Sequence, residues 1–243
     1  MPHLTGFDGT AVGQAAFISS ATPKHQIGFG ARSDDGREFR YVKAGAVALV
    51  AGNALQQRIE DVDHDNITVR VTAAGATDLL ITTGASGGAL DANEYGGGFA
   101  VIDTTPGLGY IYRVDNHAAI AASTDGTLVL EDEDAIVIAL TAASKVTLAN
   151  NPYDEVIQCP VTTASGVCVG GCIYIIAISE YGWIQTHGPG AALIAGTPAV
   201  GQPVTNVSSV AGSLAVHSAE LPTAAEMMAT GRDGKVLPVF WLR

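Results

Sequence analysis

The feature that most constrains the fold is a strand pattern that occurs twice in the chain. Residues 181–185 alternate aromatic or apolar with small or polar side chains, and they precede a Gly-Pro-Gly sequence at 188–190 and a small apolar run at 191–196. Residues 39–43 run into the apolar stretch 45–52 in a similar way. Each copy predicts an alternating strand, a small-residue turn and a short apolar strand that ends at Gly. We therefore expect two equivalent hairpin-like corners of one β-domain, with the chain between them partly inserted.

Short strand-like runs also fill the middle of the sequence, and turn signals separate them every 8–12 residues or so. The clearest of these runs are 67–72, 79–83, 99–102, 110–114, 128–130 and 135–140. Such spacing favours a sandwich or barrel over a helical fold. One short helix is expected at 222–230, where Gly231 can end it, and a final strand is expected at Val236–Leu242.

These patterns predict an all-β protein with a barrel- or sandwich-like domain. We place its boundaries at 36–60 and 154–243, with a smaller β-domain inserted or neighbouring at 61–153. Residues 1–35 are polar, small and punctuated by Gly, with no sustained period. They are expected to form an extended N-terminal arm that orders against something else or is partly disordered.

Composition bears on the surface of the protein. Apolar residues make up 47% of the chain and charged residues only 15%, against roughly 25% charged residues in soluble domains. Many apolar residues are Ala, which suits thin, closely packed sheets. A surface partly covered by neighbours in an assembly would explain the low charge, and so would a merely Ala-rich monomer.

The charge balance and the apolar runs exclude several partners. Net charge is −12, and no basic stripe offsets it, so we expect no direct contact with nucleic acid. The longest apolar run, Cys172–Ser179, is far shorter than the roughly 20 residues of a membrane helix, so no membrane partner is expected. The N-terminus lacks the pattern of a signal peptide, and three cysteines do not suggest a secreted disulfide framework.

Motifs with catalytic or metal-binding chemistry are weak, and we predict no catalytic residue, cofactor or metal. Ser86 stands in a G-x-S-x-G sequence at 84–88, but the helix that a nucleophile elbow requires does not follow it. Asp61, Asp63 and Asp65 open like a calcium loop, which then lacks the required Gly and the final Glu. Cys168 and Cys172, four apart on a strand, are expected to be buried thiols.

Three stretches carry a resemblance to a known family: Phe39–Gly45, Asn151–Tyr153 and Tyr181–Thr186. Together they resemble virion structural proteins of tailed bacteriophages, and most of all the capsid cement, or decoration, proteins. The likeness spans about residues 36–200. It implies a β-rich, β-tulip-type or barrel-like domain that binds the outer face of the phage head without enzymatic activity.

The resemblance also implies partners and a location. The expected partners are the major capsid protein and two further copies of this chain in a homotrimer, on the capsid exterior of a virion assembled in the host bacterial cytoplasm. Core or inter-subunit positions are expected for the aromatic and imidazole side chains of the repeated pattern: Phe39, Tyr41, Tyr181, Trp183 and His187.

Two alternatives come from other functional classes. A host-recognition protein of the head or tail would bind surface glycans on an exposed aromatic platform near Trp183 or Tyr112. A serine hydrolase would use Ser86 together with a histidine and a carboxylate.

Overall fold

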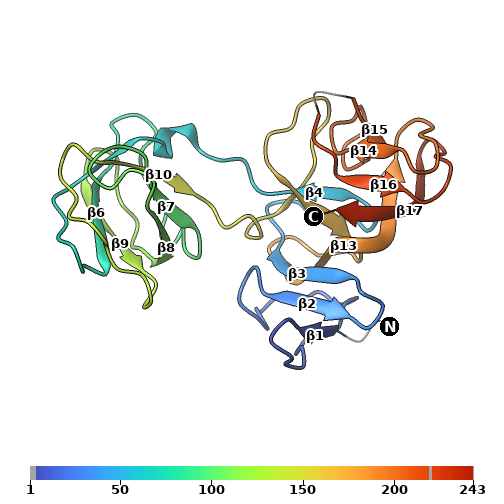
Figure 1. Cartoon of the computed structure of the whole chain (residues 1–243), viewed down its shortest axis with the longest axis horizontal. Coiled ribbons are helices and arrows are strands. Elements are labelled where there is room, and N and C mark those ends of the chain that lie inside the picture. The colour runs from blue at the N-terminus through green and yellow to red at the C-terminus, as the bar shows by residue number, and fades with distance from the viewer. Residues whose placement is uncertain (1–3, 219–220, 243) are drawn as a thin grey trace. The chain divides into compact units, whose positions relative to one another are not determined.

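The computed structural model describes residues 4–218 and 221–242, and its fold is all-β, as predicted (Figure 1). The chain divides into two compact units. The first unit contains the residues up to Ile59 and those from Pro152 onward, and the second contains Glu60–Asn151. No helix in the described part of the chain is long and apolar enough to cross a membrane.

The first unit is built on one large antiparallel sheet. Its main path runs in the order β1 (Leu4–Gly6), β2 (Gly30–Ser33), β3 (Glu38–Lys43), β13 (Tyr181–Ile194), β17 (Lys235–Leu242), β16 (Ala225–Met227), β14 (Pro203–Thr205) and β15 (Ala215–Val216). A branch leaves β13 through β12 (Cys168–Cys172), β4 (Ala54–Gln56) and β11 (Ile157–Gln158).

Strand β13 is the centre of this sheet, and it corrects the prediction of two hairpin-like corners. The two look-alike stretches do lie side by side, with Trp183 opposite Tyr41. However, β13 is one continuous strand of 14 residues whose first half pairs with β3 and whose second half pairs with β17. The register shifts between Gln185 and His187, and Gly188 takes a positive φ of 87°. The Gly-Pro-Gly sequence therefore bends a strand at a β-bulge instead of reversing the chain.

The counterpart of this second half, residues 45–52, is a loop and not a strand. Its backbone pairs with Ile176 at Leu49, and both side chains are buried. The loop therefore has no hairpin partner of its own within the 39–52 stretch.

The described part of the N-terminal segment is not a free arm. Strands β1 and β2 extend the sheet beyond β3 (Figure 1), and Leu4 and Ala16 are buried with the aromatic residues of β3 and β13. Met1, Pro2 and His3 lie outside the described residues. The sequence predicted an arm that orders against something else or is partly disordered, whereas this segment pairs with the sheet of its own unit and hydrogen-bonds to β13 through Gln14.

The predicted helix at 222–230 is also wrong. Ala225–Met227 forms β16, which pairs with β17 and β14. Ala225 and Met227 are buried while Glu226 between them is exposed, which is the period of a strand. Sheet pairing therefore overrides a weak helical propensity. The predicted final strand is confirmed as β17.

The second unit is a closed six-stranded barrel in the order β10-β5-β6-β9-β8-β7. Its elements are a 3₁₀ turn at Val62–His64, β5 (Ile67–Val69), β6 (Asp78–Thr82), β7 (Phe99–Ile102), β8 (Ile111–Asn116), β9 (Asp125–Leu130) and β10 (Lys145–Ala149). The barrel closes because β10 pairs with both β5 and β7.

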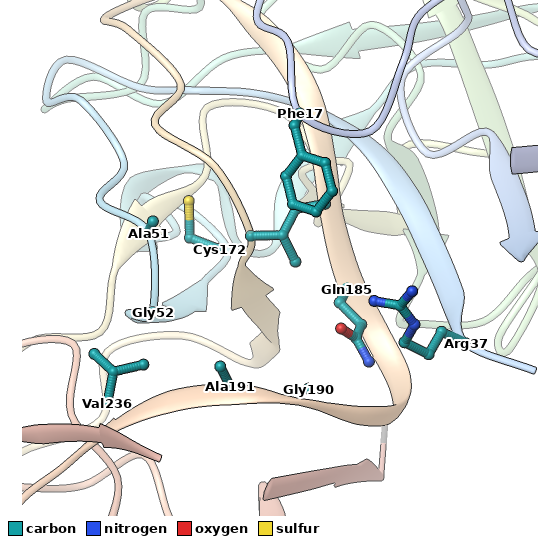
Figure 2. A pocket seen from close by; sticks show the side chains of 10 residues that line it. Phe17, Arg37, Ala51, Gly52, Cys172, Gln185, Gly190, Ala191 and Val236 are labelled. Carbon is teal, nitrogen blue, oxygen red and sulfur yellow. The ribbon is translucent and has the colours of Figure 1, made fainter. Parts of the chain in front are cut away.

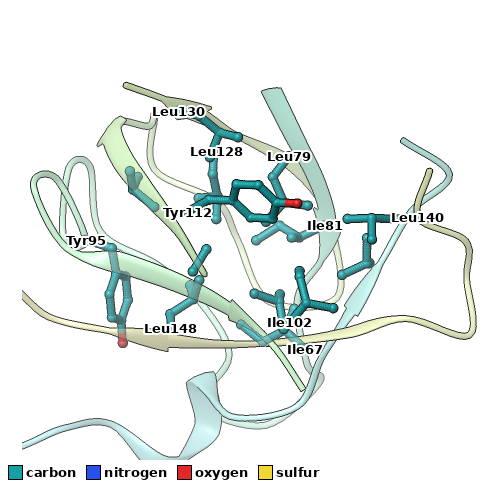
Figure 3. Close-up of a cluster of buried hydrophobic side chains, with 14 of the residues drawn as sticks. Ile67, Leu79, Ile81, Tyr95, Ile102, Tyr112, Leu128, Leu130, Leu140 and Leu148 are labelled. Atoms are coloured by element: carbon teal, nitrogen blue, oxygen red, sulfur yellow. The ribbon is translucent and has the colours of Figure 1, made fainter. Parts of the chain in front are cut away.

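Aliphatic side chains from alternate positions of these strands fill the barrel. Leu79, Ile81, Ile102 and Leu128 are fully buried there (Figure 3). Each fully buried side chain of this kind contributes about 1.5–3 kcal/mol relative to an exposed one. The barrel therefore has a hydrophobic core of its own.

Candidate interaction surface and pocket

The predicted aromatic residues come together in the first unit, in its core. Phe39, Tyr41 and Trp183 are buried, and Tyr181 is partly buried against them. The rings of Tyr41 and Trp183 meet edge to face at 5.1 Å between centroids, and Tyr41 stacks on Tyr181 at 6.2 Å. His187 lies apart from this cluster, where β13 changes partners, and its ring meets Phe240 at 5.4 Å.

A buried residue that the sequence did not single out, Gln14, joins the N-terminal segment to this cluster. Its Oε1 accepts a hydrogen bond from the Tyr41 hydroxyl (2.7 Å), and its Nε2 donates to the carbonyls of Ile18 (2.6 Å) and Tyr181 (3.1 Å). The Gln14 carbonyl accepts from Trp183 Nε1 at 3.0 Å. A lone glutamine in a polar stretch carries no sequence signal of burial, so this anchor was not predictable from the pattern.

Several exposed apolar side chains of the first unit lie on two loops that the Leu49–Ile176 bridge holds together. Leu49 and Ile176 exchange backbone hydrogen bonds of 2.9 and 3.2 Å. Around this buried bridge, large apolar side chains face solvent. We call them the apolar patch: Val47 (64% exposed), Val50 (48%), Tyr174 (43%), Ile175 (56%) and Ile178 (58%).

The apolar patch is a fixed feature of the fold. Gly52 N–H donates to the Cys172 carbonyl at 2.7 Å, and Cys172 N–H donates to Asn53 O at 2.9 Å. Clustered exposed apolar side chains on pinned backbone are typical of interaction sites. In the sequence, the signal for this patch was the apolar run 172–179. The run is too short for a membrane helix, and its sequence alone does not show what covers it.

A pocket of about 510 Å³ opens beside these loops in the first unit (Figure 2). Its walls are mostly apolar or small, with Phe17, Ala51, Ile173, Ala191 and Val236 among them. The polar side chains that line it are those of Gln185 and Arg37, and Arg37 is paired with Asp35 at 2.8 Å. Its size lies in the range of small-molecule sites.

A cluster of ion pairs in the first unit includes residues close in sequence to the ends of its two segments, at Ile59 and Pro152. Glu155 accepts from Lys43 Nζ at 3.1 Å and from an Arg58 nitrogen at 3.3 Å. The adjacent Asp154 is more buried, and burial raises the pKa of its carboxyl group despite the nearby charge of Lys43. These ion pairs hold the charged side chains against one another.

The G-x-S-x-G sequence around Ser86 does not have the geometry of a nucleophile elbow. Ser86 lies in an exposed loop, and the residues after it form turns and not the helix of a nucleophile elbow. The Asp61-x-Asp63-x-Asp65 sequence is a turn in which Asp61 Oδ1 accepts the Asp63 backbone N–H at 3.0 Å. Among the described residues, no cluster of histidine, cysteine or acidic side chains has the arrangement of a metal site.

The three cysteines are buried and form no disulfide. Cys172 donates to the Tyr174 carbonyl at 2.9 Å, and burial raises its pKa to about 12. Cys159 lies beside Cys168, and a hydrogen bond between the two side chains together with burial raises the Cys159 pKa above its usual range. The raised pKa values keep the Cys159 and Cys172 thiols protonated at neutral pH.

The aromatic platform expected for a glycan-binding protein is not present at the residues proposed for it. Trp183 is 1% exposed and Tyr112 is 3% exposed. Tyr112 points into the barrel core (Figure 3). Both rings are therefore unavailable for stacking on a sugar.

Comparison of the chain with protein-family models, with curated proteins and with solved structures gave no match.

Proposed function

We propose that this chain is a non-enzymatic capsid decoration protein of a tailed bacteriophage, which binds the outer surface of the head as a homotrimer and stabilises contacts between major capsid subunits. The resemblance of residues 39–45, 151–153 and 181–186 to cement proteins is the starting point of this proposal. The acidic net charge of −12 suits a position outside the shell, away from packaged DNA.

The observation that carries the proposal is the apolar patch. Its five side chains are between 43% and 64% exposed, so roughly half of each side chain's burial energy is still available. At about 1.5–3 kcal/mol for a full side chain, burying one patch releases on the order of 4–8 kcal/mol before the costs of association. A single contact of this size is weak. A trimer that makes three such contacts at once binds far more tightly, because the second and third contacts are intramolecular.

The experiment uses capsids of the phage that encodes this chain, prepared without it. Purified chain is added, and bound protein is measured by co-sedimentation. We expect saturable binding that Val47→Asp with Ile178→Asp reduces at least tenfold, because both substitutions place a charge in the contact. The control is Val71→Asp, which changes a valine that is 73% exposed in the second unit.

Two outcomes separate the parts of the proposal. No binding of the wild-type chain to the capsid contradicts the decoration role. Equal binding of the doubly substituted chain and the wild type contradicts the assignment of the contact to the apolar patch.

A further inference from the structure

The pocket in the first unit is lined by a buried polar side chain whose oxygen makes no hydrogen bond within the described part of the chain. Gln185 is 1% exposed. Its Nε2 donates to the carbonyls of His187, Gly188 and Pro189 at 3.0, 3.1 and 2.8 Å. No donor in the described part of the chain makes a hydrogen bond to its Oε1.

The direction of this oxygen follows from its neighbours. A Cβ atom added to Gly190, which lines the pocket, would lie 2.8 Å from Gln185 Oε1. Figure 2 shows the oxygen on the side of the pocket and the nitrogen turned away from it. The three bonds made by Nε2 fix this orientation, because a flipped amide would place the oxygen against three carbonyl oxygens.

The indole N–H of Trp241 lies beside the same glycine, since the added Cβ would also be 2.8 Å from its Nε1. It makes no hydrogen bond to Gln185 Oε1 or to another described residue. The acceptor therefore remains open toward the pocket. A ligand that directs a donor at this oxygen therefore gains a hydrogen bond in a mostly apolar site.

The walls indicate the shape of such a ligand. The pocket is lined by Ala51, Gly52, Gly190 and Ala191, whose small size leaves room for a ring. Phe17 contributes an aromatic ring (Figure 2). A planar apolar ring packs on both, and aromatic rings gain further from contact with another ring.

We propose that this pocket binds a flat aromatic ring that carries one hydrogen-bond donor, such as an indole, with its N–H directed at Gln185 Oε1. The ring belongs either to a free small molecule or to a tryptophan side chain of another protein. This inference does not depend on the capsid role, since it rests on the pocket alone.

The experiment titrates the full chain with indole and follows backbone amide shifts by NMR. We expect saturable shifts at Gly52, Gly190 and Ala191. The matched probe is 1-methylindole, which keeps the ring and lacks the donor, and we expect it to bind at least about fivefold more weakly. N-acetyltryptophanamide then distinguishes the two sources of the ring. If it binds more tightly than indole, the ring belongs to a protein side chain, and if it binds more weakly, the ring belongs to a free molecule. Either result supports the assignment of the pocket to an aromatic ring.

A blocking variant locates the site independently. Ala191 is exposed on β13 at the pocket, and Ala191→Leu is expected to weaken indole binding at least tenfold. Ala74→Leu, at an exposed alanine of the barrel unit, is expected to leave binding unchanged. The proposal is overturned if indole causes no saturable shifts, if 1-methylindole binds equally well, or if a crystal soaked with indole shows only water at Gln185 Oε1.

Discussion

Replacing Gln14 with Leu tests whether hydrogen bonds, and not a separate partner, hold the N-terminal segment on the sheet. The substitution keeps the side chain at a similar size and removes three hydrogen bonds. The Tyr41 hydroxyl is fully buried and loses its acceptor. The Tyr181 carbonyl keeps the bond from Ser20 N–H at 2.9 Å, and Ile18 is half exposed, so its carbonyl can bind water.

The magnitude follows from this inventory. One buried hydroxyl without an acceptor costs about 1–3 kcal/mol, and each of the other two lost bonds costs about 0.5–1.5 kcal/mol or less. The apolar gain of Leu offsets part of this loss. We therefore expect Gln14→Leu to lower the free energy of unfolding by about 2–4 kcal/mol, measured by denaturant titration. Amide exchange should rise over residues 14–29.

A matched control and a second substitution make the test specific. Gln26 is exposed, and Gln26→Leu should change stability by less than about 0.5 kcal/mol. Tyr41→Phe should cost at least about 1 kcal/mol less in the Gln14→Leu background than alone, because the two side chains share one bond. Equal stability of the two glutamine variants, or full additivity with Tyr41→Phe, would refute the reasoning.

Three further predictions concern other parts of the first unit. Gly170 has φ of 138°, and a Cβ there would overlap a carbonyl oxygen of β13. Gly170→Ala should therefore lower the unfolding free energy by about 2 kcal/mol or more, whereas Gly84→Ala, which meets no neighbour, should not; denaturation of the pair checks this. The Cys172 pKa is raised to about 12 from a usual value of 9.0, so the stability linked to its protonated thiol is complete below pH 9 and lost as the pH rises toward 12. The alkaline fall in stability should be shallower in Cys172→Ala by up to about 1.4 kcal/mol per pH unit; parallel curves would contradict this. The Asp35 pKa is lowered to about 2, chiefly by hydrogen bonds from Arg37 and then Ser33, so its small contribution is present above pH 3.8 and lost as the pH falls toward 2. Carboxyl NMR titration should show the Asp35 pKa rising toward 3.8 in Arg37→Gln, and an unchanged value would show that the pair does not form.

The fold class was predictable because period-2 alternation and turn signals are local properties of the sequence. The final strand carries Leu237, Val239 and Trp241 on one face, and those side chains are buried as alternation requires. The two stretches 181–185 and 39–43 have similar sequences, and from this similarity we expected them to lie side by side. These features needed no knowledge of distant contacts.

Other features depend on contacts that one stretch of sequence does not contain. Residues 135–140 look like a strand, yet they form a loop in which Ile136 and Leu140 are buried and Val137 and Ile138 are exposed. The bend of β13 depends on the Gln185 amide that binds three carbonyls of its own strand. Because such interactions are made by single polar residues, periodicity did not reveal them.

The pocket was equally hidden from the sequence. Its lining comes from segments as far apart as Phe17, Ala51, Ile173 and Val236, which the sheet order brings together. Gln185 was part of the repeated pattern, but nothing in the pattern distinguishes an amide whose oxygen is left open from one that is fully bonded.

The most direct test of the proposed function is the amount and position of this chain in purified virions. Quantitative mass spectrometry should give a copy number comparable to that of the major capsid protein, and electron microscopy should place the chain as a regular layer on the outside of the head. Absence from the particle, or a few copies confined to one vertex or to the tail, would contradict the decoration role.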